Sequence, residues 1–257
     1  MLPVLQIGPL ALQTPGLLIL LGIWLGLSAS ERTSSRLSID SNHLYNLVLI
    51  SLIAGILGAR LAYVIQYSSI FIASPLNIFS FTLTMLNGEA GLLIGLIAGF
   101  IYVQRRSMPV WETLDALASG FSIFMIFFHL ANFASGDAFG APVQMPLSIN
   151  LWGQPRYPVQ LYETAAALLI AVALNTRKQR SARGGTLFWA FMALSALARL
   201  FFEFFRGDST TLLGGIHIAQ VIAWIILAFS LWQLGKRQGP AQKPLPVESA
   251  KDDKYAA

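Results

Sequence analysis

The sequence predicts an all-α polytopic membrane protein with about seven transmembrane helices. Hydrophobic residues make up 55% of its 257 positions and charged residues only 11%, whereas soluble domains contain about 25% charged residues. The mean hydropathy is +0.63. Glycine and proline are scattered among long Leu, Ile and Phe runs, which argues against a disordered or collagen-like chain. A polytopic membrane fold is the class that fits this composition.

Seven apolar stretches are long enough to cross a bilayer core, which takes about 20 helical residues. They are 7–29, 44–66, 86–104, 114–134, 158–176, 186–205 and 212–234. No basic segment precedes the first stretch, so we interpret it as a retained span rather than a signal peptide. Residues 70–86 are also apolar, but a further span there would put the basic loop after the third stretch on the wrong side. We therefore expect an interfacial or re-entrant arm near 70–86 and a single transmembrane domain over 1–235.

The positions of Lys and Arg predict the orientation, because cytoplasmic loops carry an excess of these residues. Most of the 17 basic residues follow the first, third, fifth and seventh stretches. This pattern places the N-terminus outside and the C-terminus in the cytoplasm, with 236–257 as a disordered cytoplasmic tail. The tail begins with basic residues that suit anionic membrane lipids, so the formal charge of +5 requires no nucleic-acid partner. The absence of cysteine excludes disulfides and thiolate chemistry by the chain itself.

Ionisable side chains within the spans are costly to bury and therefore indicate functional sites. Those away from the cytoplasmic ends all fall in the predicted extracytoplasmic half: Arg60, Glu89, His129, Asp137, Glu163, Arg199, Glu203, Arg206 and His217. This one-sided distribution suggests a site that receives a headgroup or reactant from outside. Substrate sites of transporters lie near the midplane, so a transporter or channel is the less favoured function class.

In the sixth stretch, Arg199, Glu203 and Arg206 are spaced i, i+4 and i+7, which predicts that they share one helical face. Two guanidiniums against one carboxylate leave a donor fork that suits bidentate phosphate recognition. Simple pairing of Arg199 with Glu203 is the structural alternative. Arg60 either adds to the same positive field or extends to the membrane interface. The histidines and carboxylates lack metal-ligand spacing, so we expect neither a metal nor an organic cofactor.

Five blocks of sequence carry a family resemblance. Between 115 and 140, Asn132-Phe133, Gly136-Asp137 and Gly140 match a signature that usually reads Gly-Arg-x-Gly-Asn-Phe, then Asn-Gly-Glu and a closing Gly. The other blocks are Gly58-Ala-Arg60-Leu-Ala-Tyr63, Arg156-Tyr-Pro158-Val-Gln160-Leu161-Tyr162-Glu163, Arg199-Leu-Phe-Phe-Glu203-Phe-Phe-Arg206, and Gln220. In this order and spacing they resemble the prolipoprotein diacylglyceryl transferase family.

The chain departs from the family pattern at several positions. The signature arginine falls on His129, and its flanking glycines fall on Phe128 and Ala131. A tyrosine usual in the first span and a His-Gly pair usual in the third span are also absent. These replacements leave a second function class open, a catalytically degenerate paralogue that binds phospholipid without transferring it.

The resemblance implies an enzyme of the bacterial inner membrane whose active face is extracytoplasmic. It implies transfer of the diacylglyceryl group from phosphatidylglycerol to the lipobox cysteine thiol of a prolipoprotein, with release of glycerol 1-phosphate. The implied partners are therefore phosphatidylglycerol, the prolipoprotein and the surrounding membrane lipids. The nucleophile belongs to the substrate, so the enzyme has to hold the phosphate, assist deprotonation and stabilise the leaving group.

The same resemblance implies roles for individual residues. Arg199 and Arg206, assisted by Arg60, would bind the phosphate, and Glu203 would orient Arg199 or accept a proton. His129 would be a phosphate-binding cation, a neutral general base, or simply a hydrogen-bonded core residue. The remaining candidates would contact the headgroup or shape the wall of the site, or be structural: Asn132, Asp137, Tyr63, Gln160, Tyr162 and Glu163.

Overall fold

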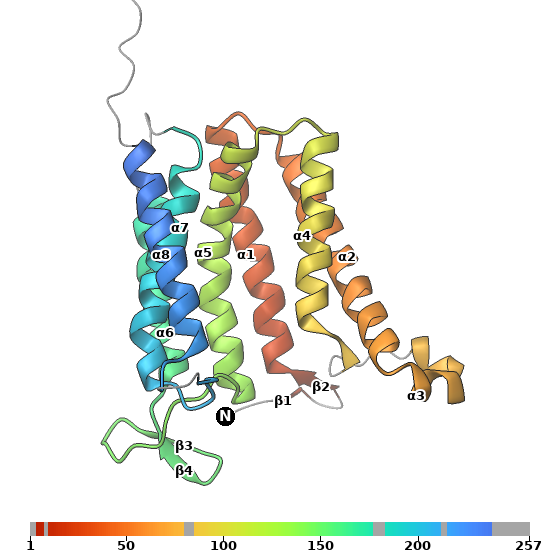
Figure 1. Cartoon of the computed structure of the whole chain (residues 1–257), viewed down its shortest axis with the longest axis vertical. Coiled ribbons are helices and arrows are strands. Elements are labelled where there is room, and N and C mark those ends of the chain that lie inside the picture. The colour runs from red at the N-terminus through yellow and green to blue at the C-terminus, as the bar shows by residue number, and fades with distance from the viewer. Residues whose placement is uncertain (1–3, 8–9, 80–84, 177–182, 212–214, 238–257) are drawn as a thin grey trace, which may run out of the picture.

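The computed structural model describes the chain except for residues 1–3, 8–9, 80–84, 177–182, 212–214 and 238–257. Long antiparallel helices form the body of the molecule (Figure 1). They are α1 (Thr14–Arg36), α2 (Ser41–Gln66), α4 (Gly88–Arg105), α5 (Val110–Ser135), α6 (Val159–Thr176), α7 (Thr186–Phe202) and α8 (Ile218–Arg237). The short elements are β1 (Val4–Ile7), β2 (Leu10–Gln13), α3 (Ser68–Ala73), η1 (Pro75–Phe79), β3 (Ile149–Leu151), β4 (Gln154–Arg156) and η3 (Glu203–Phe205).

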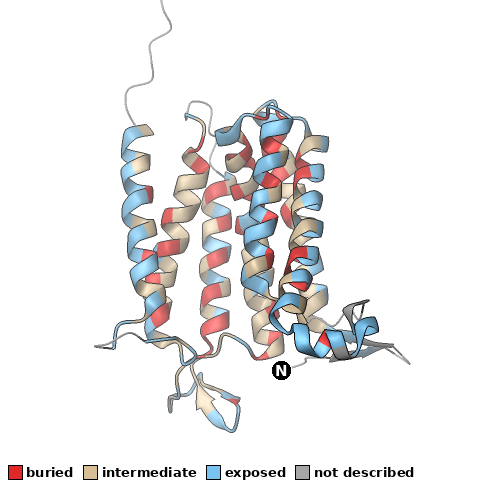
Figure 2. Cartoon of the chain, turned by 45° about the vertical axis from the view of Figure 1, so that its right-hand side comes forward, coloured by how far each residue is buried: buried red, intermediate tan, exposed pale blue. Residues whose placement is uncertain are grey.

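The described helices have the length and composition of membrane spans. Six of them, all the long helices except α4, are long and apolar enough to cross a bilayer. Helix α4 occupies the third predicted span, has 18 residues, and carries Glu89 and Arg105 near its two ends. Exposed positions cover the outward helix faces in Figure 2, and many of them are large apolar residues such as Leu20, Trp24 and Ile65. The all-α polytopic membrane class is therefore confirmed.

The predicted start of the first span was wrong. The first span does not begin at Ile7, because Leu10–Gln13 pairs with Val4–Ile7 as an antiparallel hairpin. An apolar run of this length cannot by itself distinguish a strand from a helix, and Pro15 in the first turn favours a helix start at Thr14.

The ends of α7 and α8 also differ in detail from a simple helical span. Helix α7 ends at Phe202 and continues as the 3-10 helix η3, and together they cover the predicted sixth span, Thr186–Phe205. Helix α8 begins only at Ile218, and 212–214 lie outside the described residues. At its other end α8 includes Lys236 and Arg237, which the sequence assigned to the tail. The rest of that tail lies outside the described residues.

Close backbone contact holds the helix pairs together. Helix α1 packs along α5, and α2 packs along α4. A Cβ atom on Gly120 would lie 2.6 Å from the carbonyl oxygen of Gly26, and one on Gly91 would lie 2.8 Å from that of Gly55. Small residues allow such approach in membrane helices, where dispersion contacts replace the hydrophobic effect as the driving force.

Polar contacts between helices supplement this packing. Thr33 donates a hydrogen bond to Ser119 across the α1–α5 contact at 2.9 Å, and Ser119 in turn contacts Asn175 of α6. Near the opposite end of α5 from the site described below, buried Asp115 accepts bonds from the backbone N–H groups of Gly185 (2.7 Å) and Phe188 (2.8 Å). The carboxylate thus satisfies donors at the start of α7, where the helix dipole favours negative charge.

The arm expected near 70–86 does not span the bundle. Its described part consists of α3 and η1, which project from the end of α2 (Figure 1), whereas 80–84 lie outside the described residues. Arg60 of α2 holds this segment by donating to the carbonyl oxygens of Asn77 (2.6 Å) and Met85 (3.0 Å). Its guanidinium also lies 5.3 Å from the ring centre of Phe71.

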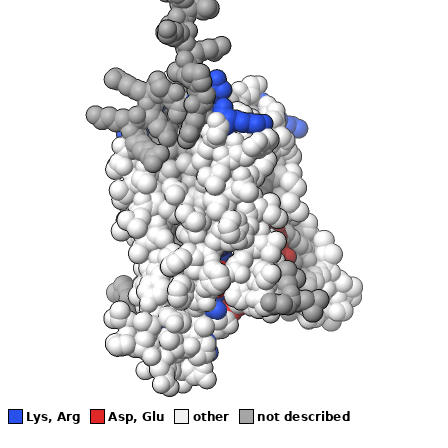
Figure 3. All heavy atoms as spheres, turned by 60° about the vertical axis from the view of Figure 1, so that its left-hand side comes forward, with Lys and Arg blue, Asp and Glu red and all other residues white. Residues whose placement is uncertain are grey.

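Charged side chains are concentrated toward the two ends of the bundle. Figure 3 shows basic residues at the end opposite the arm, and a belt of uncharged residues between the two ends. The β3–β4 hairpin projects from the same end as the arm (Figure 1). Lys236 and Arg237, the last residues of α8, belong to the basic end.

Candidate functional site

A cavity of about 650 Å³ lies between α5, α6, α7 and α8. One end is lined by charged or polar side chains, namely His129, Asn132, Glu163, Arg199, Arg206 and Asp208. The other end is apolar, with Met125, Ile170, Met192 and Ile226 in its walls. On α5, the wall extends from Ser122 to Asn132, which corresponds to about 15 Å of helix. The cavity therefore suits a ligand that has one charged end and one apolar end.

The antiparallel arrangement of the helices explains why the polar groups meet. His129 and Asn132 lie near the C-terminal end of α5, and Arg199 lies near that of α7. Glu163 lies in the second turn of α6, which runs the other way. These segments are far apart in the sequence but lie at the end of the bundle that carries the β3–β4 hairpin (Figure 1).

Glu163 is the centre of the charged cluster. Its side chain is only 5% exposed, and its Oε2 atom lies 3.1 Å from Nδ1 of His129. Its Oε1 atom lies 3.3 Å from Nη1 of Arg206 and 3.5 Å from Nη1 of Arg199. One carboxylate thus contacts cationic or titratable groups from α5, α7 and the segment after η3. The sequence placed Glu163 only in the wall of the site, although a carboxylate within a span is itself a signal of function.

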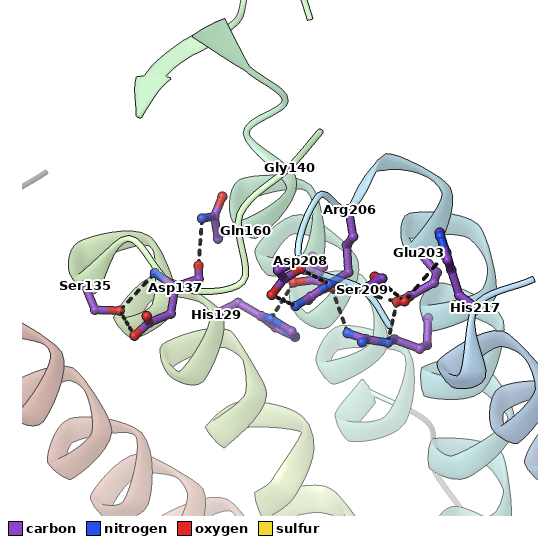
Figure 4. A network of polar contacts seen from close by, with 12 residues as sticks. His129, Ser135, Asp137, Gly140, Gln160, Glu203, Arg206, Asp208, Ser209 and His217 are labelled. Carbon is purple, nitrogen blue, oxygen red and sulfur yellow. Dashed lines mark hydrogen bonds and ion pairs between the residues drawn. The ribbon is translucent and has the colours of Figure 1, made fainter. Parts of the chain in front are cut away.

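Arg199 and Glu203 form the i, i+4 pair that the sequence predicted. Nε of Arg199 lies 3.0 Å from Oε2 of Glu203, whose side chain is 1% exposed. Oε1 of Glu203 accepts a hydrogen bond of 2.5 Å from Ser209 and lies 3.8 Å from Nδ1 of His217. Figure 4 shows Ser209 and His217 pointing toward Glu203. Arg199 itself is 38% exposed and faces the cavity.

Arg206 reaches the cluster by a route that helical spacing did not predict. Its backbone is extended, with φ −79° and ψ 144°, because the helical segment ends at Phe205. Ala141 donates its N–H to the carbonyl of Phe205 at 2.8 Å, and Gly207 donates to that of Phe139 at 2.9 Å. The expectation of one continuous helical face was wrong, and the bridge to the segment around Gly140 positions Arg206 instead.

Asp208 is a member of the cluster that the sequence analysis missed. Arg206 donates from Nε to Oδ1 of Asp208 at 2.9 Å and from Nη2 to Oδ2 at 2.6 Å. Asp208 follows the last helical residue of its segment, so no periodicity marks it, and only the short Arg-Gly-Asp separation hints at a contact. Figure 4 shows Asp208 beside Arg206.

The charge balance of the cluster differs from the prediction. Two arginines were expected to face one carboxylate, whereas among the described residues they contact Glu163, Glu203 and Asp208. Burial alone would lower the pKa of Arg206, but its hydrogen bonds to Asp208 and the charges of all three carboxylates outweigh burial and raise that pKa. Arg206 therefore stays positively charged, and its Nε and Nη2 donors are both bound to Asp208.

The other candidates around α5 and α6 have different positions. Asn132 lines the cavity. Asp137 is exposed, accepts from Ser135 at 2.7 Å, and receives a bond from Nε2 of buried Gln160 at 2.8 Å on its backbone carbonyl. The ring of Tyr162 stacks on Phe202 with 6.4 Å between ring centres. Gln160 and Tyr162 therefore support the segments that carry the site and do not line the cavity.

Arg60 and Tyr63 are not brought into this cluster. Both lie on α2, where Arg60 holds the arm and its guanidinium lies 6.0 Å from the ring centre of Tyr63. Neither residue lines the cavity between α5 and α8. In the described part of the chain, no group of three His, Asp or Glu side chains is arranged to hold a metal ion.

The family model described as prolipoprotein diacylglyceryl transferase matches residues 3–235. The chain belongs to this family. Relatives named phosphatidylglycerol–prolipoprotein diacylglyceryl transferase include one from Nostoc sp., 29% identical over 269 aligned residues that cover 97% of this chain and 94% of the relative. One from Synechococcus elongatus is 27% identical, with 88% and 83% covered, and one from Clostridioides difficile is 27% identical, with 82% and 84% covered.

Family membership confirms the resemblance and extends it to nearly the whole chain. His129 is the residue on which the sequence predicts a departure from the family signature. In this member of the family that position contacts Glu163 and lines the cavity. His129 therefore lies at the charged end of the cavity.

Proposed function

We propose that this chain transfers the diacylglyceryl group of phosphatidylglycerol to the lipobox cysteine thiol of prolipoproteins. The observation that carries the proposal is the amphipathic cavity, which has arginines and His129 at one end and apolar walls beyond them. A phospholipid has the same division into a charged headgroup and apolar chains. The family and the names of the relatives support transfer as the reaction.

We assign phosphate binding to Arg199 and Arg206. A guanidinium offers planar, paired donors that match phosphate oxygens. Arg199 faces the cavity with more than a third of its side chain exposed. Glu203 is buried against Nε of Arg199, which favours an orienting role over that of a proton acceptor.

In the proposed reaction, the cysteine sulfur forms a bond to the carbon of the diacylated glycerol that carries the phosphate. The bond between that carbon and the phosphate oxygen breaks, and its electron pair leaves with glycerol 1-phosphate. Negative charge increases on the leaving phosphate, so positioned guanidiniums stabilise the transition state more than the ground state. The thiol proton goes to a base in the site.

His129 is the residue that we assign as this base. Its Nδ1 atom lies 3.1 Å from the Glu163 carboxylate. A contact of this kind orients an imidazole and stabilises the cation that forms when Nε2 accepts a proton. Asn132, which lines the same end of the cavity, is positioned to hydrogen-bond the glycerol headgroup.

We further propose that the site opens to the extracytoplasmic face of the bacterial inner membrane, with the N-terminus outside. The basic residues at the ends of α4 and α8 lie opposite the charged cluster, and cytoplasmic ends carry the basic excess. The polar end of the cavity also lies toward one end of the bundle, whereas transporter substrates bind near the midplane.

The test is transfer of diacylglyceryl label from phosphatidylglycerol to a lipobox peptide by the purified chain. We expect transfer by the wild type and a loss of about 10²-fold or more in Arg199→Ala. Arg105→Ala is the matched control, because Arg105 is an exposed arginine at the opposite end of the bundle. Binding of phosphatidylglycerol without transfer by the wild type would contradict the enzyme assignment and leave a phospholipid-binding protein.

A further inference from the structure

The side chain of Asp208 occupies the donor fork that the proposed phosphate ligand would need. Nε and Nη2 of Arg206 both donate to this carboxylate, at 2.9 and 2.6 Å, and Nη1 lies 3.3 Å from Glu163. The side chain of Arg206 is only 10% exposed. A carboxylate held by two parallel N–H groups has the geometry in which arginine also holds a phosphate. In this state Arg206 presents no second fork to a ligand.

We propose that Asp208 is a competing anion that phosphatidylglycerol displaces from Arg206 when it binds and that returns to Arg206 when the phosphate product leaves. This inference rests on the proposed function, because it takes the phosphate of the lipid to be the ligand of Arg206. It assigns to Asp208 a part in setting affinity and product release, although Asp208 itself touches Arg206 rather than the reacting atoms.

Burial distinguishes Asp208 from the other two carboxylates of the cluster. The side chains of Glu163 and Glu203 are 5% and 1% exposed, and each contacts groups from more than one segment. Displacing either would leave a buried charge without its partners, which is strongly unfavourable. The Asp208 side chain is 26% exposed and lines the cavity. Its described side-chain partner is Arg206 alone, so it can exchange into water at small cost.

The exchange keeps the charge beside Arg206 balanced. The phosphodiester of phosphatidylglycerol carries one negative charge, so it replaces Asp208 without changing the net charge beside Arg206. The product is a phosphate monoester with about 1.5 to 2 negative charges at neutral pH, and it would bind two arginines more tightly than the substrate does. Return of Asp208 opposes this tight binding and so speeds release of glycerol 1-phosphate.

The experiment compares wild type, Asp208→Asn and Asp208→Glu in two assays. The first measures binding of the purified chain to phosphatidylglycerol vesicles without any peptide, and its competition by glycerol 1-phosphate or inorganic phosphate. The second measures KM and kcat for transfer to a lipobox peptide. Glu89→Gln is the matched control, because it removes one exposed carboxylate from the start of α4, away from the cavity.

For Asp208→Asn we expect binding to phosphatidylglycerol vesicles about threefold tighter or more, as loss of an exposed competing pair allows. The KM for phosphatidylglycerol should fall by a similar factor, and inhibition by glycerol 1-phosphate should strengthen, with kcat unchanged or lower. Asp208→Glu keeps a competing carboxylate and should therefore tighten binding less than Asp208→Asn does, and Glu89→Gln, which lies away from the cavity, should behave like the wild type. Asp208→Ala removes the same carboxylate and provides the test if Asp208→Asn does not fold.

Two outcomes would overturn the inference. Weaker or unchanged vesicle binding by Asp208→Asn would mean that Asp208 positions Arg206 for the substrate rather than competing with it. If Glu89→Gln tightened vesicle binding to the same extent, the effect would come from the change in the protein's net charge and not from the contact with Arg206. Because vesicle binding needs no transfer, tighter binding by Asp208→Asn in a chain that transfers nothing would support the competition and contradict the proposed reaction. Normal transfer by the wild type, with vesicle binding by Asp208→Asn that is not tighter, would support the proposed reaction and contradict the competition.

Discussion

Nδ1 of His129 lies 3.1 Å from Oε2 of Glu163, which joins the C-terminal part of α5 to the second turn of α6. The two residues are separated along the sequence by the segment that contains the β3–β4 hairpin. Glu163 also contacts both arginines of the cluster. The relationship therefore couples the proposed base to the proposed phosphate-binding groups through one buried carboxylate.

Replacement of His129 tests its assignment as the base. We expect His129→Gln to lower kcat by about 10²- to 10⁴-fold, the range that a general base contributes. His129→Arg should be equally inactive, because a guanidinium cannot accept a proton. Transfer by His129→Arg at the wild-type rate would instead show that this position supplies a cation. His43→Gln is the control, since His43 contacts Tyr102 near the start of α2.

Arg156 is expected to position Arg206 from outside the cavity. It donates to the carbonyl oxygens of Gly140 (3.1 Å) and Leu151 (3.2 Å), and Gly140 is bridged to Arg206. Arg156→Met should raise the KM for phosphatidylglycerol about threefold to tenfold through loss of two charge-assisted hydrogen bonds. Amide hydrogen exchange of Ala141 and Gly207 should become faster. Leu147→Ala is the control, because Leu147 is exposed and lies just before the β3–β4 hairpin that contains Arg156. It should change neither the KM nor the exchange rates.

Gly120 is expected to be required for the contact between α1 and α5. In Gly120→Ala the added Cβ would lie 2.6 Å from the carbonyl oxygen of Gly26, and overpacking of this kind costs about 1–3 kcal/mol. The Tm of the purified protein in detergent should fall. Gly235→Ala is the matched control, because no atom lies within 4 Å of the added Cβ and alanine favours the helix. A Gly120→Ala protein with unchanged Tm would refute the packing argument.

Arg60 is expected to hold the arm rather than to bind phosphate. Arg60→Met removes the hydrogen bonds to Asn77 and Met85, which are worth about 1.5–3 kcal/mol each because the donor is charged. Hydrogen exchange should accelerate in η1 and at the start of α4, while binding of glycerol 1-phosphate should stay unchanged. Weakened binding of that phosphate would instead return Arg60 to the phosphate site. Arg105→Met serves as the control.

Much of the fold follows from the sequence because a bilayer accepts few structures. Apolar stretches of about 20 residues predict helices whatever they pack against, and they identified α2, α5 and α6 to within a few residues. The hairpin of β1 and β2 was not predicted, because its apolar residues are compatible with both a strand and a helix pattern.

The candidate site was predicted in part. His129, Asn132, Glu163 and the Arg199–Glu203 pair were identified, because ionisable or polar side chains are rare within spans and i, i+4 spacing fixes a contact inside one helix. The sequence did not predict the contact of Asp208 with Arg206 or those of Arg60 with the arm, because both depend on non-helical segments, which have no periodic sequence pattern.

The sequence by itself determined the class of fold, the helices and the gathering of unusual polar groups toward one end of the bundle. These properties follow from local composition and from the cost of burying charge in lipid. Only the tertiary structure decided which of those groups meet. Glu163 became the centre of the cluster, and Asp208 came to occupy the fork of Arg206. Such contacts join distant segments, which helix packing and backbone bridges bring together.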